Sequence, residues 1–79
     1  MSVHVMYYGM LAELTGKTEE SWIAGEELTV GEFRAQILDK YPAIREKKFK
    51  IAVNKQISDD LKLISDLAEI ALLPPFAGG

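Results

Sequence analysis

The chain has 79 residues, 48% of them hydrophobic and 27% charged, which suits one small folded domain. It contains no cysteine and a single histidine, His4, which excludes disulfides, a thiol nucleophile, thiolate metal sites and a zinc site built only from imidazoles. The formal net charge of −3 disfavours non-specific binding to nucleic acid. No apolar run approaches the ~18 residues of a membrane span, and residues 1–9 carry no signal-peptide pattern. We therefore expect a cytoplasmic, soluble protein that contacts neither nucleic acid nor membrane.

Residues 3–8 are β-branched and aromatic, a composition typical of a strand. A short helical turn is predicted over Met10–Leu14, with Gly16 as its stop. A weaker strand is predicted over Glu19–Ile23, with Trp22 or Ile23 turned inward. Alternation in the first strand places one set of side chains in the core and the other near solvent: Val3, Val5 and Tyr7 in the core, and His4, Met6 and Tyr8 outside.

The clearest local motif is a capping box at Thr29 and Glu32, in which each side chain can bond the other residue's backbone amide. It predicts the start of the main helix. Pro42 restricts the residue before it, so the helix should end near Lys40. The apolar stripe of this helix consists of Val30, Phe33, Ile37, Leu38 and Tyr41, and we expect Phe33, Ile37 and Tyr41 to pack in the core.

Residues 45–50 form a basic cluster, which we interpret as a solvated loop before a strand, with a docking patch for an anionic partner as the alternative. Residues 51–54 read as that strand, and Asn54-Lys55 as a turn. Asp59-Asp60 is interpreted as an exposed turn rather than a metal site, because no third ligand is evident.

The last predicted strand, residues 69–73, is almost continuously apolar. Such a run suits a central strand buried on both faces, or a strand with one face at an interface. The order strand, short helix, strand, helix, strand, strand predicts an α+β roll, a mixed sheet of four to five strands packed on one main helix. We expect the first and last strands to lie side by side in its middle.

The final segment after this strand is the most informative. Pro74 and Pro75 cannot continue a strand and favour an extended path. Gly78 and Gly79 have no side chains, so the terminal carboxylate can enter a narrow space. Fully extended, residues 74–79 reach about 20 Å, enough to place that carboxylate inside another protein's active site. The alternatives are a frayed terminus and the scar of a cleaved precursor.

Several motifs resemble those of the small subunits of molybdopterin synthase, which have a ubiquitin-like β-grasp fold. The residues that carry the resemblance are Tyr7-Tyr8-Gly9, Leu14-Thr15-Gly16, Thr29-Val30-Gly31-Glu32, Ala52-Val53-Asn54 and Glu69–Gly79, above all the Leu-Pro-Pro-x-x-Gly-Gly ending. The resemblance implies one β-grasp sulfur-carrier domain over residues 1–79, with residues 74–79 as an extended C-terminal tail. The sequence departs from the family's pattern at Leu67-Ala68, where Gly-Asp is usual, and at Lys55, where glycine is common.

The resemblance also implies a chemistry. An activating enzyme uses ATP to adenylate the Gly79 carboxylate, which becomes a thiocarboxylate and donates sulfur for the molybdopterin dithiolene inside the large synthase subunit. Gly78 is the slim lead-in, and Pro74, Pro75, Phe76 and Ala77 complete the partner-binding tail, with Phe76 expected as an apolar anchor at the channel mouth. This chain would bind no cofactor or metal, would lack catalytic groups of its own, and would form a heterotetramer with the large subunit.

Other functions share the same ending. A sulfur carrier for thiazole or tungsten-pterin synthesis would need the same thiocarboxylate, and a ubiquitin-like modifier would need the same Gly78-Gly79 terminus. A β-grasp interaction module with an incidental tail would need neither. Capture of the large synthase subunit would separate molybdopterin synthesis from the other carrier pathways. Stable conjugates to other proteins would indicate a modifier, and full function after removal of residues 77–79 would indicate an interaction module.

Overall fold

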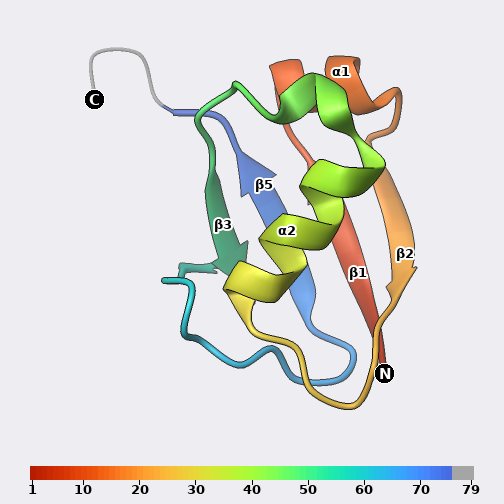
Figure 1. The fold of residues 1–79 in the computed structure, drawn as a ribbon, viewed down its shortest axis with the longest axis vertical. Coiled ribbons are helices and arrows are strands. Elements are labelled where there is room, and N and C mark those ends of the chain that lie inside the picture. The colour runs from red at the N-terminus through yellow and green to blue at the C-terminus, as the bar shows by residue number, and fades with distance from the viewer. Residues whose placement is uncertain (76–79) are drawn as a thin grey trace.

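The computed structural model describes residues 1–75, so the predicted tail residues Phe76, Ala77, Gly78 and Gly79 lie outside the described part of the chain. Five strands form one mixed sheet in the order β2-β1-β5-β3-β4. The helix α2 crosses one face of this sheet and leaves the other face open (Figure 1). The elements are β1 (Ser2–Tyr7), α1 (Met10–Thr15), β2 (Glu19–Ile23), α2 (Val30–Lys40), the 3₁₀ turn η1 (Pro42–Ile44), β3 (Lys50–Val53), β4 (Gln56–Ile57) and β5 (Glu69–Leu73).

The first and last strands are neighbours and run parallel, with Val5 opposite Ile70 and Tyr7 opposite Leu72. The strand β3 flanks β5 on its other side in the antiparallel sense. This confirms the expected central position of the chain's last strand. The connection from β1 to β5 spans most of the sequence, so this pairing is a long-range contact whose closure carries an entropic cost.

The core lies between the sheet and α2, and it consists of the inward-facing residues of every long strand together with the apolar stripe of the helix. The predicted assignment of Val3, Val5 and Tyr7 to this core is confirmed. Its members are Val3, Val5, Tyr7, Leu11, Trp22, Leu28, Val30, Phe33, Ile37, Ile44, Ile51, Val53, Ile64, Ala68, Ile70 and Leu72.

The weak second strand is confirmed as β2, and its inward residue is Trp22. The Trp22 ring packs edge-on against Phe33 of α2, with ring centroids 5.6 Å apart, while its indole nitrogen donates to the Gln36 side chain at 3.1 Å. Ile23, on the other face, is 78% exposed. An indole that meets an aromatic ring and finds a hydrogen-bond acceptor is well satisfied in this position.

The capping box is confirmed in both directions. The Glu32 amide donates to the Thr29 hydroxyl at 3.1 Å, and the Thr29 amide donates to the Glu32 carboxylate at 2.9 Å. At the other end α2 stops at Lys40, one residue before Tyr41 and two before Pro42, as predicted. Both boundaries of α2 therefore follow from local chemistry.

Three features were not predicted: the 3₁₀ turn η1, the short strand β4, and the way residues 61–68 close the sheet's lower end. Residues in this last segment bond back to distant elements, because Val30 donates to the Lys62 carbonyl at 2.9 Å and Leu67 donates to the Ser2 carbonyl at 2.7 Å. Such long-range bonds leave no periodicity in the sequence.

None of the helices described within residues 1–75 is long and apolar enough to cross a membrane.

The two departures from the resembled family fall on unusual backbone. Lys55 has φ 70° and Leu67 has φ 64°, both in the left-handed region that glycine occupies without strain. Asn54, with φ 49°, precedes Lys55 in the β3–β4 connection. Two successive residues with positive φ are what a tight hairpin turn with right-handed strand twist requires.

We predict that Lys55→Gly stabilises the fold by about 0.5–1 kcal/mol, because relief of left-handed strain exceeds the added unfolded-state entropy. The melting temperature should rise by a few degrees in a thermal scan followed by circular dichroism. Lys48→Gly is the control, since Lys48 is exposed and has an ordinary φ. Equal changes in both variants would contradict the assignment of strain to Lys55.

Candidate functional site

The candidate site is the end of β5 and the surface around it. Leu73 closes the strand opposite Lys50 of β3, and the Tyr8 amide donates to the Leu72 carbonyl at 3.3 Å. The base of the predicted tail is thus held on both sides by strands that belong to the rigid sheet. Pro74 comes next and has no amide hydrogen to continue the ladder, so regular pairing ends there.

Gly9 sets the position of Pro74. Gly9 has φ 57° and ψ −133°, a conformation that side-chain-bearing residues rarely adopt. A β-carbon at Gly9 would lie 3.2 Å from Cγ of Pro74, so the absence of a side chain lets the proline ring rest close to the first turn of α1. The turn between β1 and α1 therefore leaves room for the first residue of the tail, because Gly9 carries no side chain where Pro74 lies.

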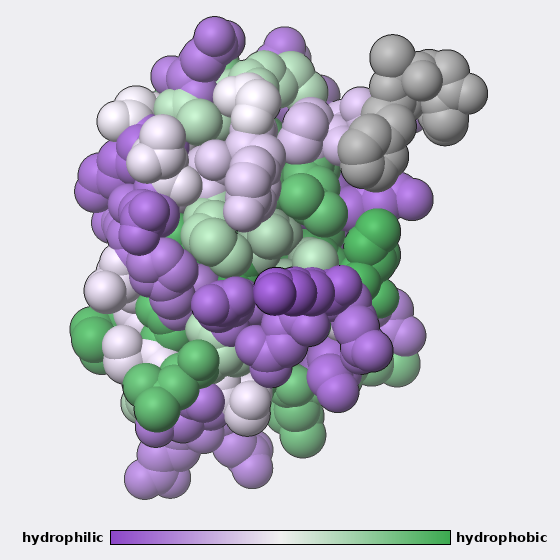
Figure 2. Space-filling model, turned by 180° about the vertical axis from the view of Figure 1, so that it is seen from behind, coloured by the Kyte–Doolittle hydropathy of each residue, from purple (hydrophilic) through white to green (hydrophobic). Residues whose placement is uncertain are grey.

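The open face of the sheet carries an apolar groove beside the base of the tail. Its volume is about 430 Å³. Figure 2 shows hydrophobic side chains gathered on this face, opposite α2. Because β5 contributes both the groove and the base of the tail, a partner that receives the tail can contact the groove at the same time. The groove is lined by Met6, Tyr8, Ala52, Lys55, Ile57, Glu69, Ala71 and Leu73.

The alternation in β5 explains its continuous apolar run. Ile70 and Leu72 are fully buried against the helix side, whereas Ala71 and Leu73 are only half-buried on the open face. The structure contradicts burial of this strand on both faces, because one face lies in the core and the other is open. Contact of the open face with a partner stays a prediction. Ile57 was not singled out from the sequence, and Ala52 was noted only as part of a motif. The sheet brings them together, because Ala52 of β3 lies opposite Ala71 of β5 on one side and opposite Ile57 of β4 on the other.

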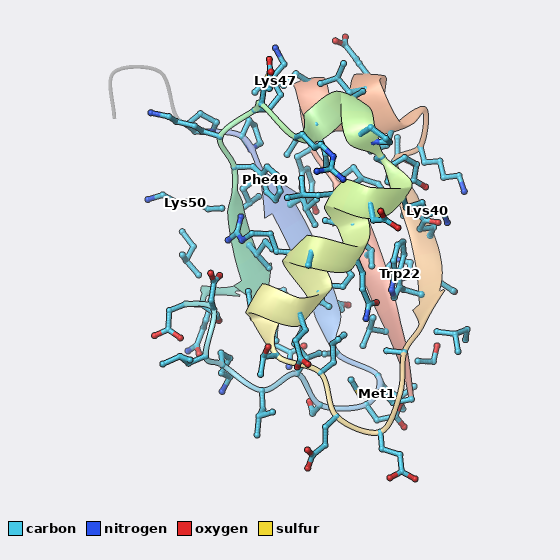
Figure 3. The ribbon with its side chains drawn as sticks, in the orientation of Figure 1. Met1, Trp22, Lys40, Lys47, Phe49 and Lys50 are labelled. Carbon is cyan, nitrogen blue, oxygen red and sulfur yellow. The ribbon has the colours of Figure 1, made fainter. Side chains whose placement is uncertain are left out.

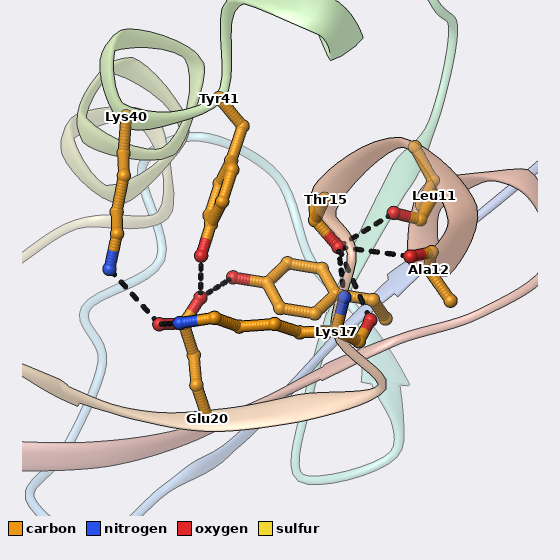
Figure 4. Close-up of polar contacts among 8 residues, drawn as sticks. Leu11, Ala12, Thr15, Lys17, Glu20, Lys40 and Tyr41 are labelled. Carbon is orange, nitrogen blue, oxygen red and sulfur yellow. Dashed lines mark hydrogen bonds and ion pairs between the residues drawn. The ribbon is translucent and has the colours of Figure 1, made fainter.

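A part-buried carboxylate, that of Glu20 with 10% of its side chain exposed, secures α2 to the sheet on the helix side. One oxygen of Glu20 accepts hydrogen bonds from the hydroxyls of Tyr7 and Tyr41 (Figure 4). Its other oxygen lies 3.0 Å from Nζ of Lys40 and 3.3 Å from Nζ of Lys17. The network joins β1, β2 and the C-terminal end of α2, and every acceptor on the carboxylate is used.

This environment changes the proton affinities of the network. Burial alone would raise the pKa of Glu20, but the hydrogen bonds from Tyr41, Tyr7, Lys40 and Lys17 outweigh it and lower that pKa to about 2. Burial, followed by the bond to Glu20, raises the pKa of Tyr7 far above its usual range. The bond to Glu20 also raises the pKa of Lys40. We interpret the network as structural, since its charges are mutually satisfied.

We predict that this carboxylate makes the fold sensitive to acid. Because the folded-state pKa lies below the ordinary 4.5, the stabilisation is complete above about pH 4.5 and disappears as the pH falls toward 2. Glu20→Gln should cost at most about 3 kcal/mol of unfolding free energy at pH 7, with the gap to wild type closing near pH 2.

Urea unfolding between pH 2 and 7 measures this difference. Glu13→Gln, at an exposed position of α1, is the control and should follow the wild type throughout. A Glu20→Gln variant whose stability stays parallel to wild type over the whole range would exclude this role for Glu20.

The remaining candidate residues are placed as follows. Asp59 and Asp60 are exposed; Asp59 accepts from the Leu61 amide at 2.9 Å and Asp60 pairs with Arg34 at 3.4 Å. His4 is on the open face and forms a 3.0 Å pair with Glu19. Within residues 1–75 no three carboxylate or imidazole side chains gather in a way that could hold a metal ion. Among the predicted tail residues, only Pro74 and Pro75 belong to the described part.

Comparison with known proteins identifies the class. The model of the ThiS family matches residues 5–79, and the chain therefore belongs to the ThiS family. Curated relatives that match along the chain include several molybdopterin synthase sulfur carrier subunits. The molybdopterin synthase sulfur carrier subunit of Caenorhabditis elegans is 36% identical, with 100% of this chain and 99% of that protein aligned.

Solved structures agree with the architecture. A chain from the protein–protein complex of subunits 1 and 2 of molybdopterin-converting factor from Helicobacter pylori matches with 29% identity, a TM-score of 0.70 and full coverage of both chains. The small archaeal modifier protein 1 of Methanosarcina acetivorans matches with 28% identity and a TM-score of 0.75, covering 99% of this chain and 96% of that one. The fold is the ubiquitin-like β-grasp, as predicted.

Proposed function

We propose that this chain is the sulfur carrier subunit of a molybdopterin synthase. The observation that carries the proposal is similarity along the whole chain to curated subunits of that name, in a chain that ends on Gly78-Gly79. The structure supports it physically, because the described chain leads from the central strand β5 directly into the tail. The folded body then serves to present one carboxylate.

The chemistry follows from the properties of that carboxylate. A carboxylate is a poor electrophile, so a partner enzyme adenylates Gly79 with ATP and releases pyrophosphate. A sulfur nucleophile then displaces AMP and leaves a thiocarboxylate. In the large subunit this sulfur is transferred to the pterin precursor, and water restores the carboxylate. Since the chain has no cysteine, the C-terminal carbonyl is where it can carry sulfur covalently.

Two partners are therefore required, the ATP-dependent activating enzyme and the large synthase subunit. We place the apolar groove against the large subunit, in a heterotetramer of two subunits of each kind, and Phe76 at the mouth of the channel that receives the tail. The groove supports this assignment because it shares β5 with the tail, and a relative forms a complex with its subunit 2. No cofactor is assigned to this chain, and the proposal puts it in the cytoplasm.

The carrier chemistry is tested by intact-mass spectrometry after incubation with ATP, the cognate activating enzyme and a sulfur source. The full-length protein should gain the mass of one oxygen-to-sulfur exchange, and deletion of Gly79 should abolish that gain while leaving the circular dichroism spectrum unchanged. An unchanged mass for the full-length protein would refute the proposal.

Docking is tested by calorimetric titration with the purified large subunit. Ile57→Glu should weaken binding at least about tenfold by placing a charge in the groove, and Phe76→Ala should cost about 1–3 kcal/mol. The matched control is Ile23→Glu, which carries the same change on the same face at the far end of the sheet, where Ile23 pairs with Ser2. Equal losses for Ile57→Glu and Ile23→Glu would refute the placement of the interface.

A second candidate is a ubiquitin-like protein modifier, favoured by the structural likeness to the archaeal modifier protein. A modifier accumulates as conjugates joined to lysines of other proteins, whereas a pure carrier does not. Denaturing gels of the native host, probed for this chain, distinguish the two. Bands that persist at higher mass after reduction would favour the modifier.

A further inference from the structure

The charges of this protein are unevenly distributed. Residues 45–55 contain five of the nine lysines and arginines but one of the twelve acidic residues, Glu46. This segment therefore has a formal charge of +4, and the rest of the chain has −7. A positive segment on an acidic protein creates a directional field, which acts on a partner before contact is made.

The positive segment lies at the base of the tail. Lys50 is directly opposite Leu73 in the sheet, and the loop before β3 passes beside the end of β5 (Figure 1). Lys47 and Lys50 extend outward from this loop and strand (Figure 3). We name Lys47, Lys48 and Lys50 the basic collar. All three side chains are exposed.

The basic collar is not neutralised by the folded body. Within residues 1–75 no carboxylate lies at ion-pair distance from its three lysines, whereas Lys17 and Lys40 pair with Glu20 and Arg34 pairs with Asp60. Arg45, next to the collar, reaches Asp39 at only 4.0 Å. The three positive charges are thus available to a partner.

The length of the tail decides what the collar can meet. When residues 74–79 are extended, their tip lies up to about 20 Å from the end of β5. A lysine beside Leu73 is then too far away to contact a nucleotide or pterin at the tip. The collar instead faces the protein surface that surrounds the mouth of the channel.

From this geometry we propose that the basic collar steers the tail into the large synthase subunit by attraction to an acidic rim around the channel mouth. This inference rests on the proposed function and extends it to the recognition step. Charges at the rim of an interface act mainly on the association rate and its salt dependence. The collar should therefore speed encounter, while the groove and Phe76 hold the complex together.

Stopped-flow association with the purified large subunit tests the proposal, using Lys47→Glu, Lys48→Glu and Lys50→Glu singly and together. The triple variant should associate at least about tenfold more slowly at low salt, with a flatter dependence on ionic strength and an unchanged dissociation rate. Lys62→Glu is the matched control, because Lys62 is also exposed but lies far from the collar. Its carbonyl accepts a hydrogen bond from the Val30 amide at the N-terminal end of α2, whereas the collar follows the C-terminal end of that helix. It should change the association rate less than about twofold.

The possible results separate cleanly. Wild-type association that is independent of salt, or equal slowing by Lys48→Glu and Lys62→Glu, would overturn the steering role. A loss of affinity that comes only from a faster dissociation rate would also overturn the steering role. The thiocarboxylate mass shift is a separate readout: if it occurs normally and steering is absent, the inference fails while the carrier function stands, and if the mass shift is absent, the carrier function itself fails.

Discussion

The parallel pairing of β1 with β5 is the constraint on which the rest of this structure depends. It places the last strand of the chain in the middle of the sheet, with Tyr7 opposite Leu72 and β3 on the other flank. A strand held on both sides has little freedom at its end. The direction in which the chain leaves the body is therefore fixed by backbone hydrogen bonds, and side chains near the tail only refine it.

Each face of β5 has a different task. The helix side is sealed by apolar packing and by the Glu20 network, in which two tyrosines and two lysines satisfy one carboxylate. The open side presents the groove, and Lys50 of the basic collar lies opposite Leu73 at the end of β5. Under the proposed function, fold stability and recognition thus lie on opposite faces of one strand, so changes to the groove need not disturb the core.

Much of this architecture could be predicted from local chemistry. The capping box at Thr29 and Glu32, the alternation of β1 and the stop before Pro42 each report on neighbours in sequence, and each was confirmed. The strand β4, the Glu20 network and the groove were missed, because they arise from residues that only the tertiary fold brings together. The contact between Gly9 and Pro74 was missed for the same reason. The sequence motif that contains Gly9 was recognised, but only the fold shows that Gly9 lies against Pro74.

The contact between Gly9 and Pro74 has a consequence for chimaeric carriers. The position of Pro74, the first residue after β5, depends on two places in the sequence, on the proline itself and on Gly9 in the turn that follows the first strand. A terminal peptide transplanted between relatives would keep its chemistry but could adopt a new heading if the recipient carried a bulkier residue at the turn. An exchange of tails between relatives thus preserves the structure only when the turn after the first strand is exchanged along with the C-terminal tail.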